Sequence, residues 1–324
     1  MAKTAKVALT PEQKKIQHRK NLAQIKKDKW IYLLLLPGVL FFLIFKIAPL
    51  WGILIALKDY YAGISFLDAP WVGLDNFINF FTDSDFLVLL KNTLIISLMN
   101  IVFFFPLPII FALLLNEIKV EFYKKALQTL VYVPHFVSMV VIASITFMLL
   151  KTPSMEGYTG GALFEIFKSV TGHDVNVLGD PGSFYWIILI QNIWKETGWG
   201  TIIFLAALAG VDVEQYEAAI VDGANRFQQM LYITLPAITS TIVIMFILRM
   251  GSILDTSFEQ ILLMQNDLNK TNSETFDTYV YNIGRVDGNY GYSTAVGLFK
   301  SIISIICIQS ANWIAKRTGQ SGLF

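Results

Sequence analysis

Several stretches of about 20 residues carry almost no charged side chains, and they constrain the fold more than any other feature. A helix of roughly 20 apolar residues is long enough to cross the ~30 Å hydrocarbon core of a bilayer. The composition agrees, because 55% of the 324 residues are hydrophobic and only 15% are charged. An ordinary soluble domain has roughly 25% charged residues. We therefore expect a polytopic membrane protein and exclude a soluble globule.

Six apolar stretches have the length of a membrane-spanning helix. They comprise approximately residues 30–57, 92–115, 127–150, 184–210, 230–264 and 293–315. The first is too long for the apolar region of a signal peptide, and no small-residue cleavage site follows it, so we expect an uncleaved span. The predicted fold is all-α, with six transmembrane helices.

The distribution of basic residues among the loops predicts the orientation. Six spans place both termini on one side, and cytoplasmic loops carry the excess of Lys and Arg. Of the 25 such residues, fifteen lie on the side of the termini and six on the opposite side. We therefore expect both termini to be cytoplasmic. The opposite loops, about 58–91, 151–183 and 265–292, are acidic and rich in aromatic residues and glycine.

The sequence lacks the common motifs of catalysis and nucleotide binding. It has no G-x-x-x-x-G-K-[ST] loop, no H-E-x-x-H and no G-x-S-x-G. Three scattered histidines and the single cysteine Cys307 disfavour a zinc cluster and a disulfide framework. His135 lies inside a span, where we expect packing or hydrogen bonding and not catalysis. We predict no enzyme activity, no metal and no cofactor on this chain. If the protein does work, we expect a partner to supply the energy.

The cytoplasmic loop between spans four and five, residues 211–236, is the most informative segment. Asp212 and, three residues later, Gln215 resemble a capping box that starts a short helix. Gly223 offers a turn without a Cβ penalty. A second amphipathic run leads to Pro236, where the next span begins. We expect a helical knob joined to two membrane helices, so that a push on the knob moves both.

This loop resembles the EAA signature of permease subunits of binding-protein-dependent ABC importers. The matching positions are Glu217, Ala218, Ala219, Asp222, Gly223, Ala224, Ile233, Leu235 and Pro236. The resemblance implies the type I ABC importer permease fold and makes the knob a coupling helix in a groove of the ATP-hydrolysing subunit. The alternative interpretation of this loop is an amphipathic linker that lies on the membrane surface.

Further motifs extend the resemblance over nearly the whole chain. Residues 72–77 and 92–94 are similar to the first outer loop of maltose-type carbohydrate permeases, and an LplB-like branch is matched at 115–118, 132–136, 278–281, 295–299 and 311–313. The resemblance implies a bacterial inner (plasma) membrane protein that transports an oligosaccharide. It implies four kinds of partner: a second permease, two cytoplasmic ATP-binding subunits that hold ATP and Mg²⁺, an extracytoplasmic solute-binding lipoprotein and the sugar. The expected domains are a basic arm (1–29), a permease domain (30–315) and a cytoplasmic tail (316–324).

Polar residues inside the spans are candidates for the substrate path, because such residues usually face a cavity or a partner. The candidates are Asn192, Trp194, Lys195, Glu196 and Trp199 in span four, and Arg249, Ser252, Thr256, Glu259 and Gln260 in span five. Those of span five fall within an arc of roughly 100° if the helix is continuous. Contact with the sugar and pairing across helix interfaces, for example of Lys195 or Arg249 with Glu196 or Asp255, both remain open.

Three glycines in these spans, Gly198, Gly200 and Gly251, are either bending points or close helix contacts.

Two other functions are compatible with polar residues inside the spans. An ion-coupled secondary carrier or channel would use Lys195 and Glu196 as part of a relay, but leaves the knob unexplained. A membrane assembly protein with no pathway predicts polar stripes that bury against each other without a cavity.

Overall fold

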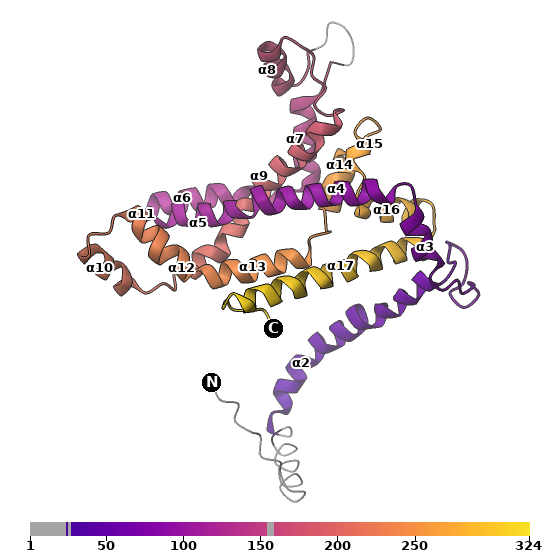
Figure 1. The fold of residues 1–324 in the computed structure, drawn as a ribbon, viewed down its shortest axis with the longest axis horizontal. Coiled ribbons are helices and arrows are strands. Elements are labelled where there is room, and N and C mark those ends of the chain that lie inside the picture. The colour runs from indigo at the N-terminus through magenta and orange to yellow at the C-terminus, as the bar shows by residue number, and fades with distance from the viewer. Residues whose placement is uncertain (1–23, 25–26, 154–158) are drawn as a thin grey trace, which may run out of the picture. The chain divides into compact units, whose positions relative to one another are not determined.

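The computed structural model describes Gln24 and residues 27–153 and 159–324, and their regular structure is helical (Figure 1). Within these residues, β-structure is limited to two isolated bridges, Lys58–Trp71 and Tyr61–Asn289. The all-α prediction is thus confirmed. The chain divides into two compact units, Met1–Leu54 and Ile55–Phe324. Most of the predicted basic arm lies outside the described residues.

The described part of the first unit is an apolar helix. It begins as α2 (Lys29–Phe42) and continues through a π-helical segment, η1 (Leu43–Ile47), into a 3₁₀-helical segment, η2 (Ala48–Leu57), which runs into the second unit. Pro37 lies inside α2 without ending it. The helix is apolar on all sides, which is typical of a membrane span and not of an amphipathic surface helix.

The remaining helices belong to the second unit. They are α3 (Asp75–Thr82), α4 (Phe86–Met99), α5 (Pro106–Asn116), α6 (Glu121–Tyr132), α7 (Met139–Leu150), α8 (Ala162–Thr171), α9 (Pro181–Leu208), α10 (Val213–Val221), α11 (Arg226–Gln229), α12 (Leu235–Ala237), α13 (Thr239–Gly251), α14 (Phe258–Met264), α15 (Lys270–Ser273), α16 (Phe276–Tyr281) and α17 (Tyr290–Arg317). Shorter π- or 3₁₀-helical segments, η3 (Asn100–Phe104), η4 (Val133–Phe136), η5 (Met230–Thr234) and η6 (Asn282–Val286), join some of them.

Three to six of these segments qualify as membrane spans by length and composition. Three are continuous: Lys29–Leu57, Phe86–Asn116 and Tyr290–Arg317. Three more qualify if each bent helix pair is one span: Glu121–Phe136 with Met139–Leu150 (93°), Pro181–Leu208 with Val213–Val221 (75°) and Arg226–Ala237 with Thr239–Gly251 (58°). Each of the six apolar stretches of the sequence overlaps one of these segments.

The fifth predicted span, residues 230–264, is not one continuous helix. Its helix α13 ends at Gly251, and a linker of residues 252–257 leads to the separate helix α14. Ser257 has a φ of 43°, in the left-handed region. The arc predicted for the polar residues of this span is therefore wrong, because it required uninterrupted helical geometry.

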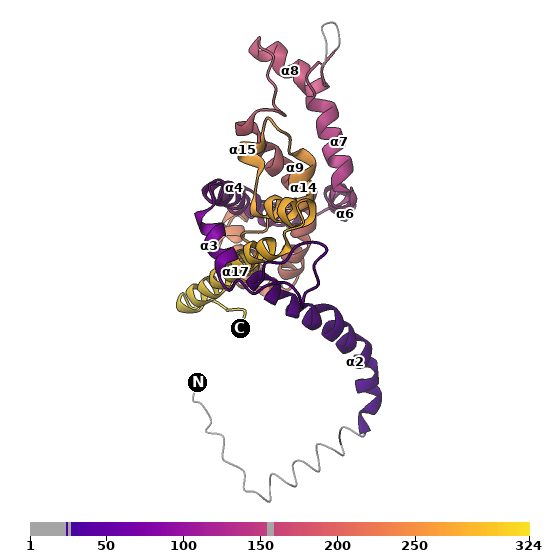
Figure 2. The same cartoon turned by 90° about the vertical axis from the view of Figure 1, so that its right-hand side faces the viewer.

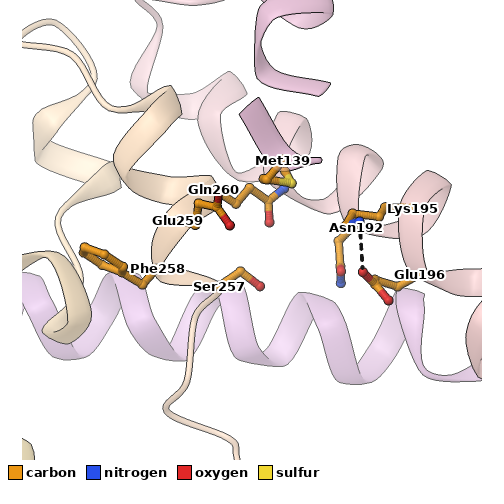
Figure 3. A pocket seen from close by; sticks show the side chains of 8 residues that line it. All are labelled: Met139, Asn192, Lys195, Glu196, Ser257, Phe258, Glu259 and Gln260. Atoms are coloured by element: carbon orange, nitrogen blue, oxygen red, sulfur yellow. Dashed lines mark ion pairs between the residues drawn. The ribbon is translucent and has the colours of Figure 1, made fainter. Parts of the chain in front are cut away.

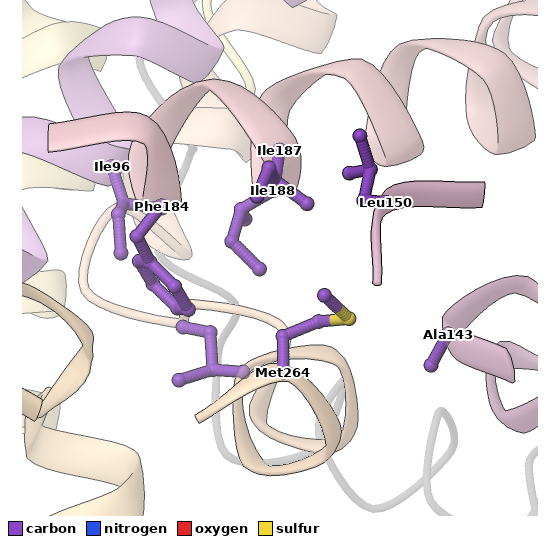
Figure 4. Packing of buried hydrophobic residues seen from close by; sticks show 8 residues of the cluster. Ile96, Ala143, Leu150, Phe184, Ile187, Ile188 and Met264 are labelled. Carbon is purple, nitrogen blue, oxygen red and sulfur yellow. The ribbon is translucent and has the colours of Figure 1, made fainter. Parts of the chain in front are cut away.

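Long helices pack against one another in the second unit, α5 along α9 and α13 along α17 (Figure 1). One buried apolar cluster joins α4, α7, α9 and α14, with residues that include Ile96, Phe184, Ile188 and Met264 (Figure 4). A second cluster joins α3, α4, α16 and α17, and a third joins α5 with α9. Helix α8 lies at the far end of α7, away from the long helices of this unit (Figure 2).

Of the three glycines noted in the predicted spans, Gly198 and Gly200 lie at close contacts between helices. Helix α9 runs through Gly198 and Gly200 without a break. A Cβ on Gly198 would clash with the carbonyl oxygen of Val131 on α6, and one on Gly200 would lie 3.0 Å from Pro108. Gly251 combines both interpretations, because it is the last residue of α13 and its Cβ would lie 2.9 Å from Ile308.

Candidate functional site

The predicted knob is formed by α10 and α11, and hydrogen bonds fix where each helix starts. Asp212 Oδ1 accepts from the amide of Glu214 at 3.0 Å and so caps α10. The capping box lies on the following helix instead: Asn225 Oδ1 accepts from the Gln228 amide at 2.9 Å, and Gln228 Oε1 accepts from the Asn225 amide at 2.8 Å. Sequence reasoning missed this box, although Asn-x-x-Gln fits the same rule.

Gly223 makes the turn between the two helices. Its φ is 78°, a value that costs other L-residues energy because of Cβ contacts. The amide of Gly223 donates to Ile220 O at 3.1 Å, and the amide of Ala224 donates to Ala219 O at 2.9 Å. The turn expected at Gly223 is confirmed, and the space around its Cα is open.

The knob presents an apolar surface beside Glu217. None of the residues of α10 is buried, and Glu217 and Ala218 are exposed. The exposed apolar side chains of the two helices are Val213, Ile220, Val221 and Phe227. Such a patch at the tip of a loop is typical of an interaction surface.

Two side-chain contacts tie the knob to the bundle. Tyr216 Oη lies 3.0 Å from Thr234 Oγ1, and Arg226 pairs with Glu117 at 3.3 Å. The remaining signature residues lie at the start of the next span: Ile233 and Leu235 are half-buried and Pro236 is exposed. The knob is therefore joined to the segment that leads into α13 by Tyr216, to the end of α5 by Arg226, and to α9 by the chain itself.

Polar residues of α9 hold the bend between α6 and α7. His135 Nδ1 lies 2.9 Å from Glu196 Oε2. Lys195 Nζ donates to the carbonyl oxygens of His135 at 2.6 Å and Val137 at 2.8 Å. The imidazole also stacks on Trp199. The hydrogen-bonding role expected for His135 is confirmed.

A cavity of about 240 Å³ lies between α9 and the start of α14, and most of the residues that line it carry polar groups (Figure 3). Its lining residues are Met139, Asn192, Lys195, Glu196, Ser257, Phe258, Glu259 and Gln260. Lys195 Nζ and Glu196 Oε1 are 3.8 Å apart, the ion pair drawn in Figure 3. Amide, carboxylate, ammonium and hydroxyl groups in one cavity suit a ligand rich in hydroxyls, and Phe258 adds an aromatic ring.

Five of the ten predicted path residues meet in this cavity: Asn192, Lys195, Glu196, Glu259 and Gln260. The other five do not line it. Trp194 lines a separate, largely apolar pocket, Trp199 lies on His135, Thr256 bonds to Asp277, and Arg249 and Ser252 lie at the end of α13. Met139, Ser257 and Phe258 were missed. Ser257 and Phe258 directly precede two candidates, but they fall outside the helical arc that the sequence predicted.

The cavity-lining amides are also bonded within the bundle. Asn192 donates to Asn100 Oδ1 on the neighbouring segment η3. Gln260 donates to Ile188 O at 2.8 Å and Gln191 Oε1 at 3.0 Å. Pairing across interfaces and exposure to a cavity therefore occur in the same residues, and the two interpretations are not exclusive.

Comparison with known proteins places the chain in a family. Residues 105–320 match the family described as binding-protein-dependent transport system inner membrane component. The chain is 53% identical to Protein LplB of Bacillus subtilis, over 94% of this chain and 93% of that protein. It is 44% identical to the polygalacturonan/rhamnogalacturonan transport system permease protein YteP of the same organism, over 96% and 95% of the two chains.

A solved structure with the same fold is that of a bacterial alginate ABC transporter in complex with an alginate pentasaccharide-bound periplasmic protein. The TM-score is 0.82 at 35% identity, covering 93% of this chain and 99% of that one. The chain therefore belongs to the inner-membrane permease family of binding-protein-dependent ABC importers. The predicted family and fold are confirmed, and the chain is a multi-pass transport permease and not an enzyme.

Proposed function

We propose that this chain forms, together with a second permease, the translocation path for an oligosaccharide that an extracytoplasmic binding protein delivers. The observation that carries the proposal is the exposed knob of α10 and α11, which bears the Glu217–Gly223 signature and is connected to α9. Two relatives support the substrate class, since one is named for polygalacturonan and rhamnogalacturonan and the other was solved with a pentasaccharide-bound protein.

The knob is the proposed docking site for an ATP-hydrolysing subunit. Its exposed apolar side chains would enter a groove of that subunit, and Glu217 would accept a charge-assisted hydrogen bond from a basic groove residue. ATP and Mg²⁺ would be held by the partner subunits. The distribution of Lys and Arg supports a cytoplasmic knob and cytoplasmic termini.

Motion of the knob would reach the cavity through α9. This helix is continuous from Pro181 to Leu208 and carries Asn192, Lys195 and Glu196 on the way. Nucleotide-driven closure of the ATPases would therefore move one wall of the cavity relative to α14. The chain would bind the sugar differently in two states and would make or break no covalent bond.

Transport by reconstituted vesicles tests the proposal. Vesicles would contain this chain, its second permease and the ATPase subunits, with binding protein added on the opposite side. The probes would be labelled alginate pentasaccharide and polygalacturonan fragments. We expect uptake of at least one probe to require both ATP and the binding protein. Uptake driven by a proton or sodium gradient without ATPase subunits would instead support the ion-coupled carrier.

A further inference from the structure

The linker of residues 252–257 is held by side chains of other helices. The hydroxyl of Ser97 on α4 donates to the carbonyl oxygen of Ile253. Asp277 Oδ2 on α16 accepts two hydrogen bonds from Thr256, one from its amide at 3.0 Å and one from its hydroxyl at 3.1 Å. Because the linker is not helical, these contacts decide where it lies.

Lys300 on α17 completes this anchor. It is only 9% exposed, and its ammonium forms an ion pair with Asp277 Oδ1. The same ammonium lies 3.2 Å from Asp255 Oδ1 in the linker itself. A buried charge is costly unless it is paired and hydrogen-bonded. Lys300 therefore requires its carboxylate partners, and Asp277 links α17 to Thr256.

The anchored linker leads directly into the cavity wall. Thr256, which Asp277 holds, is followed by Ser257 in the left-handed conformation and then by Phe258 and Glu259. On the far side of this short segment, Gln260 is fixed to α9 by its bonds to Ile188 and Gln191. A strained residue such as Ser257 persists only when its surroundings hold it in place.

We propose that Lys300 and Asp277 are positioning residues for the cavity between α9 and α14. Neither residue lines the cavity. Through Thr256, the pair fixes where Ser257, Phe258 and Glu259 stand relative to α9, and so sets the width of the cavity. The inference rests on the proposed function insofar as that function makes the cavity part of the sugar path.

A buried cysteine in the linker reports its position without any transport. Leu254 is 1% exposed, and Cys307 is the only cysteine of this chain, so Leu254→Cys in a Cys307→Ser background gives this chain a single reporter thiol. The full chain would be labelled with a maleimide in the assembled transporter in membrane vesicles. We expect slow labelling of this parent, because the thiol is enclosed.

Removal of the charge of Lys300 should expose the reporter. In Lys300→Met, Asp277 loses its cation and the linker opens more often, so we expect labelling about tenfold faster. In Lys300→Arg the cation is kept, so we expect a rate within about twofold of the parent. The matched control is Asp174→Asn, which removes the exposed Lys168–Asp174 pair and should change nothing.

Uptake kinetics supply the second measurement. For whichever probe the parent imports, Lys300→Met should raise the apparent KM about tenfold and change the maximal rate less, and Lys300→Arg should restore the KM. If Lys300→Met does not yield a folded complex, Asp277→Asn carries the same test. Unchanged labelling and an unchanged KM in a folded variant would overturn the inference. Failure of the proposed function would show differently, as a parent that lacks ATP-driven uptake.

Discussion

The imidazole ring of His135 lies flat on the indole ring of Trp199, with 4.4 Å between the ring centroids and 6° between the planes. Glu196 Oε2 is hydrogen-bonded to Nδ1 of the imidazole, and Lys195 Nζ donates to the carbonyl oxygens of His135 and Val137. These contacts occupy the place where the chain turns by 93° between α6 and α7. Three residues of one segment of α9 thus fix the bend in a neighbouring span.

The Lys195→Met variant should destabilise this bend. It leaves the carbonyl oxygens of two half-buried residues without their donor, and each costs at most about 1–3 kcal/mol, the value for a fully buried unpaired group. We expect a lower thermal unfolding temperature of the purified protein. Lys168→Met is the control, because its exposed ion pair is worth less than about 1 kcal/mol. Equal unfolding temperatures for the two variants would show that Lys195 does not hold the bend.

Close packing at Gly198 predicts a second stability effect. In Gly198→Ala the new methyl group would meet the Val131 carbonyl, so α6 and α9 must separate at a cost of about 1–3 kcal/mol. Gly297→Ala is the matched control, since Gly297 is also helical and has open space around it. Its higher helix propensity should leave stability equal or slightly raised. Thermal unfolding of both variants in detergent measures the difference.

Sequence patterns predicted the helices of this fold better than their interruptions. Six apolar stretches identified the spans, because hydropathy averages over many residues. The linker after α13 is held instead by Asp277 and Lys300, which are twenty or more residues from it and reach it only in the folded chain. The polar pair His135 and Glu196 is likewise 61 residues apart. No periodicity within one helix can encode such partners.

In the candidate site, too, features set by neighbouring residues were predicted and features set by distant residues were not. The turn at Gly223 and the exposed knob follow from local chemistry, and both were predicted. Only part of the cavity lining was predicted. Asn192 and Glu196 were predicted because they share one helical face, and α9 is a continuous helix in which they still share it. Ser257 and Phe258 enter the cavity because the linker redirects α14, which is a tertiary effect.

Gly223→Leu should uncouple transport while leaving membrane insertion intact. Two effects act together: strain of about 1–2 kcal/mol from a left-handed leucine, and a bulky side chain at the surface proposed to meet the ATPase. Gly172→Leu separates them, because Gly172 has a φ of 73° and equally open space but lies outside the knob.

We expect ATP-driven uptake to fall at least about tenfold in Gly223→Leu and to change little in Gly172→Leu, since the strain is the same in both. The amount of each variant in the membrane fraction is measured alongside. Undiminished uptake by Gly223→Leu would rule out a coupling role for this turn. Equal losses in both variants would point to backbone strain alone.

Asp83, between α3 and α4, joins two phenols from α16 and α17. Its Oδ2 accepts from Tyr279 Oη at 2.6 Å and from Tyr292 Oη at 2.9 Å, and its Oδ1 accepts from the Asp85 amide at 2.9 Å. Burial alone would raise the pKa of Asp83, but these hydrogen bonds outweigh it and hold the pKa below its ordinary value of 3.8. Burial and the bond to Asp83 also raise the pKa of Tyr279.

The sign of this shift predicts a pH-dependent stability. Because folding lowers the pKa of Asp83, its contribution is fully present above the unfolded value of about 4 and is lost as pH falls through the folded pKa. Asp83→Asn should therefore unfold at a lower temperature than the parent at pH 7, and the difference should shrink below about pH 4. Asp267→Asn, an exposed carboxyl between α14 and α15, should match the parent at both pH values. A gap between Asp83→Asn and the parent that stays constant down to pH 3, measured by thermal unfolding, would contradict a charged Asp83 as the cause.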